Sequence, residues 1–251
     1  MNILDANHYL LSVKLLRDKV SSFDQYPFSL DVIRRLDSIE FHPKITFIIG
    51  ENGTGKSTLL EAIATAYGFN PEGGSKNFRF TTRSSHSDLY KYIRLIKNYR
   101  KPKDGYFLRA ESYFNVGTEI EKLDEEPFGG PPIINSYGGK SLHEQSHGES
   151  FFSLMEHRFG GHGLYILDEP EAALSPARQM AMISRMHELI NKQSQFIIAT
   201  HSPIILSYPD SDIYEILNGE MKKSDYEDTE HYSITRDFLN SPSLFLESLL
   251  D

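Results

Sequence analysis

The stretch ITFIIGENGTGKST, residues 45–58, decides how the rest of the chain is interpreted. Its first five residues are apolar or β-branched, which predicts a buried strand over Ile45–Ile49. The pattern G-x-x-x-x-G-K-S follows, and a helix is expected over Ser57–Tyr67. Glycines let such a loop curl until its backbone N–H groups converge, and the helix N-terminus adds positive potential there. The stretch therefore predicts a loop that binds phosphate groups.

Each position of this loop has an expected role toward a nucleoside triphosphate, and ATP is the expected nucleotide. Lys56 is expected to reach the β- and γ-phosphates, and the Ser57 hydroxyl is expected to bind Mg²⁺. The alternative is a glycine-rich turn that carries a lysine by chance, but the strand before it and the helix after it argue against this. The expected nucleotide-binding positions of the loop are Gly50, Glu51, Asn52, Gly53, Thr54, Gly55, Lys56, Ser57 and Thr58.

A second apolar strand, Leu164–Leu167, ends in two acids, Asp168 and Glu169. Successive side chains at a strand end point to opposite sides, so the two carboxylates can serve different purposes. Asp168 is expected to hold Mg²⁺, and Glu169 is expected to polarise the attacking water as a catalytic residue. Solvated acids at a strand end are the alternative. The phosphate loop upstream favours the catalytic interpretation.

A histidine follows a third apolar strand in the same way. The strand Phe196–Ala199 leads into Thr200 and His201. A histidine at this place can contact a γ-phosphate, which would add His201 to Glu169 and Lys56 as a catalytic residue. A structural histidine at a strand end is the alternative.

The segment HEQSHGES, residues 143–150, has two incompatible interpretations. Its first five letters form H-E-x-x-H, which on a helix places two histidines one turn apart as zinc ligands of a protease. Both histidines must then share a continuous helix, and Gly148 directly after the second one opposes this. Placing Gly148 at a helix N-terminus, where backbone amides point at a phosphate, suits the sequence better.

These motifs, in this order, resemble those of an ABC-type ATPase. Residues 50–57 match its Walker A loop, and the strand ending at Asp168 and Glu169 matches its Walker B motif. Residues 171–176 match the D-loop, and His201 matches the switch histidine. The signature motif is matched by Ser146, Gly148 and Glu149, which the resemblance adds to the expected nucleotide contacts.

The resemblance implies the fold class and the activity. We expect an α/β P-loop NTPase, an ABC-ATPase-like head with a mixed sheet, as a single domain over residues 1–251 with a helical lobe at about 75–160. The implied reaction is Mg²⁺-dependent hydrolysis of ATP. The implied assembly is an ATP-dependent head-to-tail homodimer, in which Ser146 and Gly148 of one copy face the nucleotide on Lys56 of the other.

Within this superfamily the chain looks closer to soluble ATPases of DNA repair, chromosome maintenance and phage defence than to transporter subunits. The letters DEPE at 168–171, followed by Leu174-Ser175-Pro176, are similar to a motif of such small ATPases. The segment between Ser57 and Ser146 is too short for long coiled-coil arms. The alternatives are an ATP-binding subunit of a membrane transporter and an ATP-gated toxin-control module in phage defence, in which binding matters more than turnover. A cytosolic effector is a possible partner.

Two elements of the family pattern are missing from the sequence. A glutamine loop is expected between Walker A and the signature, but Arg109-Ala110-Glu111 stands there, and Glu111 is a candidate metal or water contact. No aromatic residue is identifiable as the one that stacks on adenine. Tyr26 and Phe28 are candidates, with a place in the core as the alternative for each.

Composition limits the remaining choices. The chain has 251 residues, no cysteine, and 26 basic against 35 acidic residues, for a net charge of −9. The absence of cysteine excludes disulfide frameworks and thiol catalysis, and fits a reducing cytoplasm. No apolar run is long enough to span a bilayer, so we expect no membrane segment in the chain.

One stretch is basic in this acidic chain. Residues 76–103, which begin and end with a lysine, contain nine lysines and arginines. A helix is expected over Ser87–Tyr99, in which Lys91, Arg94 and Lys97 share one face. This face is interpreted either as a solvated helix surface or as a contact to DNA phosphates.

The remaining elements follow from apolar periodicity. The expected strands are Ile45–Ile49, Tyr106–Leu108, Leu164–Leu167, Phe196–Ala199 and Ile213–Leu217. The expected helices are Ser57–Tyr67, Ser87–Tyr99, Glu149–Arg158, Pro176–Lys192 and Ser243–Leu250.

Overall fold

The fold is described from a computed structural model, which describes residues 8–76, 87–110, 113–125, 131–141, 143–145 and 147–250. The strands are β1 (Leu10–Leu15), β2 (Ser38–Glu40), β3 (Ile45–Gly50), β4 (Ile93–Lys97), β5 (Asp104–Arg109), β6 (Gly163–Asp168), β7 (Gln195–Ala199), β8 (Asp212–Leu217) and β9 (Glu220–Ser224). The α-helices are α1 (Asp31–Arg35), α2 (Lys56–Tyr67), α3 (Tyr113–Glu125), α4 (His147–Ser153), α5 (Pro176–Asn191), α6 (Pro203–Leu206), α7 (Glu230–Asn240) and α8 (Pro242–Leu250). Short 3₁₀ helices cover Arg17–Lys19, Asp88–Lys91, Ile133–Tyr137, Pro170–Ala173 and Tyr226–Asp228, and one π-helical turn covers Leu154–Arg158.

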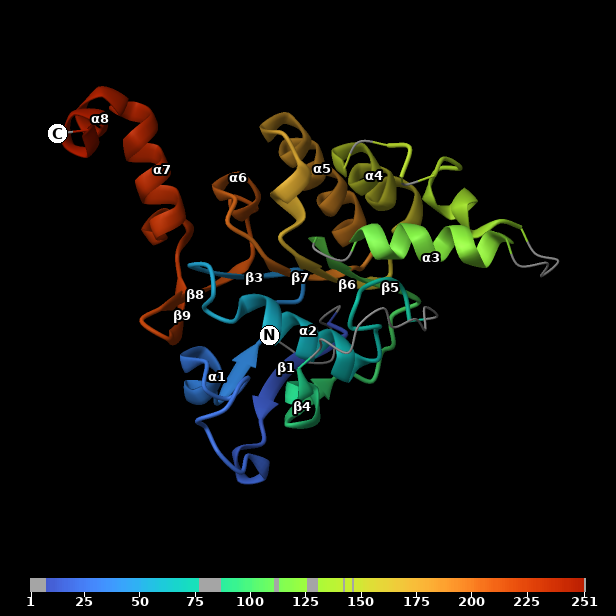
Figure 1. Ribbon diagram of the computed structural model, residues 1–251, viewed down its shortest axis with the longest axis horizontal. Helices are drawn as coiled ribbons and strands as arrows, with labels where there is room; N and C mark the ends of the chain where they lie inside the picture. Colours follow the sequence, from blue (N-terminus) through green and yellow to red (C-terminus); the bar gives the residue numbers. More distant parts are fainter. Residues whose placement is uncertain are drawn as a thin grey trace.

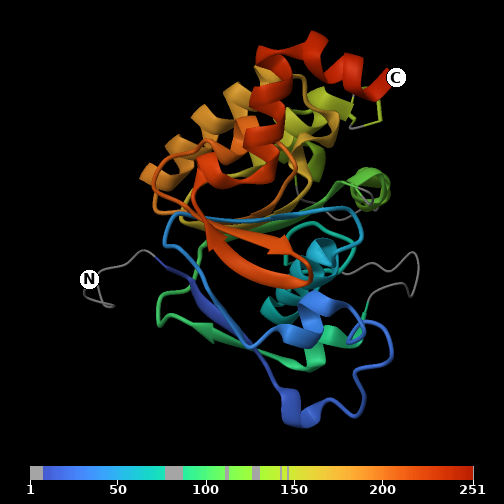
Figure 2. The same cartoon turned by 90° about the vertical axis from the view of Figure 1, so that its left-hand side faces the viewer.

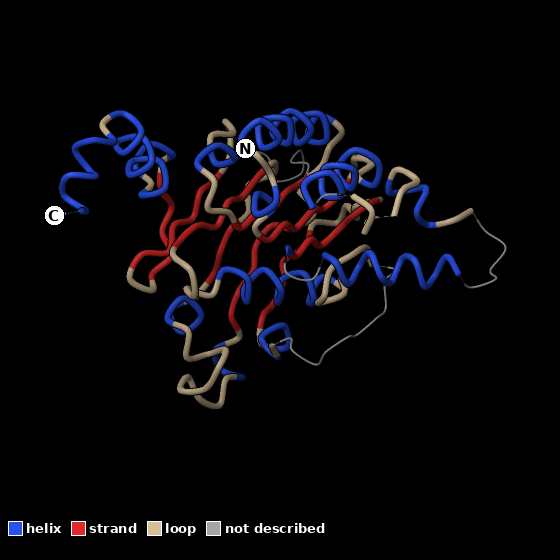
Figure 3. Tube along the Cα trace, turned by 45° about the horizontal axis from the view of Figure 1, so that its top comes forward, coloured by secondary structure: helices blue, strands red, loops and turns tan. Residues whose placement is uncertain are grey.

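A six-stranded sheet in the order β5-β6-β7-β3-β8-β9 forms the centre of the molecule. The first five strands are parallel and β9 runs antiparallel to β8. Figure 3 shows these strands running between two layers of helices. Because β7 lies between β3 and β6, the residues that follow these three strands meet at one edge of the sheet.

Both faces of this sheet are buried, and the strands alternate their apolar side chains between the two faces. Phe47 and Phe196 face the layer of α3, α4 and α5, whereas Ile48 and Ile197 face α2 and the second sheet. These four side chains are completely buried. Each such side chain contributes about 1.5–3 kcal/mol through removal from water. Continuous apolar runs are typical of parallel strands that are covered on both sides.

A second, antiparallel sheet in the order β2-β1-β4 packs beneath α2, as Figure 1 shows. Its strand β4 overturns the helix expected over Ser87–Tyr99. The structure has a 3₁₀ turn at Asp88–Lys91 and then a strand whose Ile93 and Leu95 pair with Leu15 and Val13 of β1. Pairing with the distant strand β1 therefore makes this segment a strand, although the spacing of its apolar residues fits a helix.

The other expected elements are present. The five expected strands lie within β3, β5, β6, β7 and β8, and the expected helices at 57–67, 176–192 and 243–250 correspond to α2, α5 and α8. The helix expected over Glu149–Arg158 is formed by α4 and the π-helical turn. The sequence analysis missed β1, β2, β9, α1, α3, α6 and α7.

The helical part that follows β5 spans α3 to the π-helical turn, residues 113–158. Residues 88–109, which the sequence analysis included in a helical lobe at about 75–160, instead supply β4 and β5. At the other end of the chain, α7 and α8 form an arm that projects from the sheet edge, as Figures 1 and 2 show. Neither helix of the arm contains a buried residue.

Candidate functional site

The phosphate loop connects β3 to α2, and its turn into the helix depends on two of its glycines. Gly53 and Gly55 have φ angles of 81° and 99°, in the left-handed region that favours glycine. A Cβ on Gly55 would also lie 2.9 Å from Cγ1 of Val32. These two glycines thus allow the loop to turn sharply into the first residue of α2.

Lys56, the first residue of α2, turns its side chain back over the loop. Its Nζ donates hydrogen bonds to the carbonyl oxygens of Gly50 at 2.7 Å and Glu51 at 2.8 Å. Only 4% of the residue is exposed. Burial lowers the pKa of Lys56, while the negative charge of Glu169 acts in the opposite direction. The loop therefore holds a basic group at its centre, close to the acids that follow β6.

Ser57 and Asp168 meet across the sheet edge. The Ser57 hydroxyl donates a hydrogen bond of 3.1 Å to Oδ1 of Asp168, whose residue is only 4% exposed. A hydroxyl oxygen and a carboxylate oxygen are hard donors of the kind that Mg²⁺ prefers. These two residues therefore fit the magnesium site expected from the sequence. The third expected metal ligand, Glu111, lies outside the described residues.

Glu169 takes a different direction from Asp168. Its backbone is left-handed, with φ of 51°, and its N–H donates to the carbonyl oxygen of Ala199 on β7. The side chain is 40% exposed, and its Oε1 lies 3.8 Å from Nε2 of His201. A left-handed conformation is costly for a residue with a side chain and occurs preferentially at functional sites. Glu169 thus faces the open side of the site while Asp168 faces Ser57.

His201 follows β7, beside Glu169 and close enough to Lys56 to feel its charge. Its backbone N–H donates to Oε1 of Glu171 at 2.6 Å, and its Nδ1 lies 3.1 Å from Nε2 of His231. Burial, together with the charges of Lys56 and His231, lowers the pKa of His201 to about 4. The imidazole is therefore neutral at pH 7. Burial also raises the pKa of the Glu171 carboxyl.

The segment that matches the signature motif packs against the segment that matches the D-loop. Gly148 is the second residue of α4, and a Cβ there would lie 2.5 Å from the carbonyl oxygen of Ala173. Glu149 forms an ion pair of 3.7 Å with Arg178 of α5. Ser146 lies outside the described residues. The structure therefore brings the helix N-terminus at Gly148 close to the segment that follows Glu169.

The H-E-x-x-H interpretation fails in the structure. His143 lies in a turn before α4, and α4 begins only at His147, so the two residues do not share a helix. His143 Nε2 is instead 3.2 Å from the Thr118 hydroxyl. Within the described ranges, no group of three or more histidine, aspartate or glutamate side chains can hold a metal ion.

The sequence analysis left two interpretations open for Tyr26 and Phe28, a contact with adenine or a place in the core, and the structure distinguishes the two residues. Tyr26 is 62% exposed, and its hydroxyl lies 3.3 Å from that of Thr58 on the first turn of α2. Phe28 is partly buried and packs edge-on against Tyr92, and both rings pack against the core. The core role proposed for both residues therefore holds for Phe28 and is wrong for Tyr26, which borders the phosphate loop.

The place expected for a glutamine loop carries an ion pair. Arg109 ends β5, and its guanidinium lies 2.6 Å from Oε2 of Glu61 on α2. The Glu61 side chain is buried, so the pair fixes the end of β5 to α2. No feature of the sequence indicated this pair, because its partners are 48 positions apart.

The basic face expected on a helix does not form. Lys91 pairs with Asp88 at 2.7 Å, and Lys97 Nζ lies 4.4 Å from the ring centroid of Tyr67. Arg94 lies on β4, where successive residues alternate between the two faces of the strand. The three residues therefore do not share a helical stripe, and a DNA contact through them remains a prediction that this geometry does not support.

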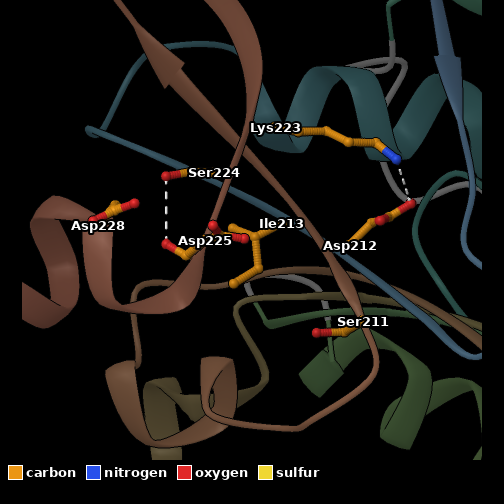
Figure 4. A pocket seen from close by; sticks show the side chains of 7 residues that line it. All are labelled: Ser211, Asp212, Ile213, Lys223, Ser224, Asp225 and Asp228. Atoms are coloured by element: carbon orange, nitrogen blue, oxygen red, sulfur yellow. Dashed lines mark hydrogen bonds and ion pairs between the residues drawn. The ribbon is translucent and has the colours of Figure 1, made fainter.

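A polar pocket of about 290 Å³ lies elsewhere, between β8, β9 and the 3₁₀ turn at Tyr226–Asp228. Figure 4 shows Lys223 and Asp212 paired on one side, and Asp225 and Asp228 on the other. Asp212 pairs in register with Thr46, at the opposite end of β3 from the phosphate loop. The pocket is therefore separate from the site around Lys56.

Comparison with known proteins agrees with this geometry. A family model described as an AAA domain matches residues 21–154, more than half of the chain, and a second described as an AAA ATPase domain matches residues 150–206. The chain belongs to the ABC-type AAA ATPases. As a member of this family it is a P-loop, ATP-binding protein, as the loop at residues 50–57 predicted.

Individual relatives point to more than one branch of the family. The chain is 27% identical to a protein of Caldanaerobacter subterraneus named as an ABC transporter ATP-binding protein, over 81% of this chain and 86% of the relative. It is 32% identical to the DNA replication and repair protein RecF of Colwellia psychrerythraea, over 36% of this chain and 22% of RecF.

The fold is shared with solved structures of ATP-binding cassettes. The structure of cbiO1 from Clostridium perfringens, part of the transporter complex cbiONQ, superposes with a TM-score of 0.52 at 18% identity. The match covers 94% of this chain and 97% of cbiO1. The expected fold class, a P-loop NTPase with an ABC-ATPase-like head, is confirmed. Within the described residues, no helix is long and apolar enough to cross a membrane.

Proposed function

We propose that the chain hydrolyses ATP with Mg²⁺, and that ATP binding joins two copies head to tail as a switch. The observation that carries this proposal is the hydrogen bond between Ser57 and Asp168, with Lys56 on one side and Glu169 on the other. The residues of one strand-loop-helix unit and of a distant strand end thus come together as a metal and phosphate site.

The roles of the residues follow from their positions. Lys56 leaves its carbonyl partners on the loop to bind the β- and γ-phosphates, and the N–H groups of residues 53–57 bind the same oxygens. Ser57 and Asp168 hold Mg²⁺, which when bound neutralises charge on the phosphates. Glu169 accepts the proton of the attacking water, since it is the acid that faces the open side.

His201 completes the site as a neutral group. Because its pKa is about 4, an uncharged imidazole N–H can donate to a γ-phosphate oxygen without taking up a proton. Tyr26 borders the first turn of α2 with an exposed ring, which suits it for contact with the adenine base.

The dimer would complete each site with a second copy. In this arrangement Ser146 and Gly148 of one copy face the γ-phosphate bound at Lys56 of the other. Gly148 is the second residue of α4, and the positive end of the helix dipole at such an N-terminus favours a nearby phosphate. Hydrolysis of ATP, with Glu169 as the base, removes the γ-phosphate, and the two copies then separate.

We place the chain in the soluble branch that serves DNA repair or phage defence, with DNA or a cytosolic effector as its partner. The end of β5 supports this, because Arg109 and its ion pair with Glu61 occupy the place where a transporter subunit would carry a glutamine loop. The transporter subunit stays the second candidate, and the Caldanaerobacter relative favours it. Affinity purification from native lysate separates the two, since one predicts a membrane protein and the other a cytosolic protein or DNA.

The test of the activity is a phosphate-release assay with ATP, with and without Mg²⁺, combined with size-exclusion chromatography in ATP and in ADP. We expect Mg²⁺-dependent turnover and a dimer in ATP alone. A monomer in both nucleotides would contradict the dimer, and absence of phosphate release in the presence of Mg²⁺ would contradict the hydrolysis.

A further inference from the structure

The histidine beside the phosphate loop has a histidine partner that no motif of the sequence indicated. His231 lies in the first turn of α7, thirty residues beyond His201. Nδ1 of His201 and Nε2 of His231 are 3.1 Å apart, and the ring centroids are 5.3 Å apart. Both imidazoles are half-buried, so the contact is not an exposed encounter of two surface rings.

A hydrogen bond between two neutral imidazoles requires one nitrogen to donate and the other to accept. Burial lowers the pKa of both histidines, so both are neutral at pH 7. Two arrangements remain. Either Nδ1 of His201 donates to His231, or Nε2 of His231 donates to His201.

The surroundings of His201 favour the second of these arrangements. Its other nitrogen, Nε2, lies 3.8 Å from Oε1 of Glu169 and has no hydrogen-bond partner within the described part of the chain. If Nδ1 carried the proton, Nε2 would present a lone pair to a carboxylate, which is unfavourable. If Nε2 carries the proton, an N–H points toward the carboxylate, and Nδ1 is free to accept from His231.

We propose that His231 is a positioning residue, which donates from Nε2 to Nδ1 of His201 and so keeps the proton of His201 on Nε2. This inference rests on the proposed function, because the N–H held on Nε2 is the group that His201 would offer to the γ-phosphate. A partner on one ring nitrogen commonly fixes which nitrogen of a functional histidine carries the proton.

The first turn of α7 is built to hold His231 in place. Thr229 caps the helix: its hydroxyl accepts from the N–H of Tyr232 and donates to the carbonyl oxygen of Tyr226. The N–H of Glu230 donates to Oε1 of Glu215, a buried acid on β8. The turn that carries His231 is therefore fixed to the central sheet, although the rest of the arm is exposed.

The test compares two substitutions of His231 with a matched control. In His231→Gln an amide N–H can replace the donor, whereas His231→Leu removes it. We expect His231→Leu to lower kcat by about 10–100-fold, as is typical for the partner of a functional histidine, with KM changed less than threefold. His231→Gln should recover most of the rate. His187→Leu removes a histidine of α5 whose ring contacts Tyr208, and it should keep the wild-type rate.

A spectroscopic measurement tests the same inference without any catalysis. Nitrogen-15 NMR of the histidine side chains at pH 7 should show His201 protonated on Nε2 in the wild type, and a mixture of tautomers in His231→Leu. A wild-type His201 protonated on Nδ1 would overturn the inference, whatever the activity. Wild-type turnover by His231→Leu would overturn it as well and would leave the proposed function intact, whereas an inactive wild type would contradict the proposed function alone.

Discussion

Ser57 and Asp168 are 111 positions apart in the sequence, and their side chains form one hydrogen bond of 3.1 Å. The bond joins the start of α2, which follows β3, to the end of β6, and one strand, β7, lies between β3 and β6 in the sheet. It exists because β3, β6 and β7 are parallel, so that their carboxyl ends share one edge. The metal site proposed for this chain depends on that meeting.

Replacement of Ser57 by alanine should abolish Mg²⁺-dependent turnover. The change removes one proposed metal ligand and the hydrogen bond to the buried carboxylate of Asp168. We expect phosphate release to fall at least about 100-fold, and the free energy of unfolding to fall by about 1–3 kcal/mol. A magnesium titration of the ATPase rate and urea denaturation measure the two effects. The control is Ser57→Thr, which keeps the hydroxyl and should keep turnover.

Replacement of Glu169 by glutamine should separate ATP binding from hydrolysis. The change removes the proposed base but keeps the size of the side chain and leaves Lys56, Ser57 and Asp168 in place. We expect hydrolysis to slow by about 100-fold or more, and the variant to accumulate as a dimer in ATP. Size-exclusion chromatography with light scattering measures the mass. Glu220→Gln, at an exposed position on β9, is the control, and a monomeric Glu169→Gln in ATP would contradict the dimer switch.

Replacement of Gly148 by alanine should disturb the contact between α4 and the segment after Glu169. The new Cβ would lie 2.5 Å from the backbone oxygen of Ala173, so one of the two segments must shift. We expect a loss of about 1–3 kcal/mol of stability and a clear loss of ATPase activity. Gly160→Ala is the matched control, because its Cβ would meet only Asp104 at 3.8 Å. Equal melting temperatures for the two variants would contradict this packing argument.

The parts of the site that were predicted from the sequence are those whose structure depends on residues that are neighbours in the sequence. A strand, a glycine loop and a lysine in direct succession determine the phosphate loop, because the backbone of that stretch alone fixes its geometry. The acids at 168 and 169 and the histidine at 201 each follow an apolar strand directly, and strand ends were recognisable from the sequence. The meeting of these strand ends is a finding of the structure, which places β6, β7 and β3 side by side and parallel.

The parts that sequence analysis missed depend on contacts between distant residues. The spacing of Leu89, Ile93 and Ile96 fits a helix, and only pairing with β1 reveals the strand β4. His231 lies on a helix of its own, and its distance to His201 depends on how α7 docks on the sheet. No spacing rule connects such residues, so the structure was needed to bring them together.

Acidification should destabilise the chain partly through His201. Burial, Lys56 and His231 lower its pKa from 6.5 to about 4, so between these values the unfolded chain binds a proton that the folded chain does not. Stability from this group is complete above pH 6.5 and is lost as the pH falls toward 4. Glu171, whose pKa is raised by burial, acts in the opposite direction. Other half-buried histidines with a lowered pKa, such as His8 and His42, add to the loss.

The contribution of His201 is isolated by comparing wild type with His201→Gln, because the other groups are present in both. The slope of the unfolding free energy against pH is measured by urea denaturation between pH 7 and pH 5. It should be shallower in the variant, because unfolding of the variant takes up fewer protons, by up to about one proton per chain. His187→Gln, which changes a histidine whose ring contacts Tyr208 away from the site, is the control. Identical slopes for wild type and His201→Gln would show that the imidazole is not held neutral by its surroundings.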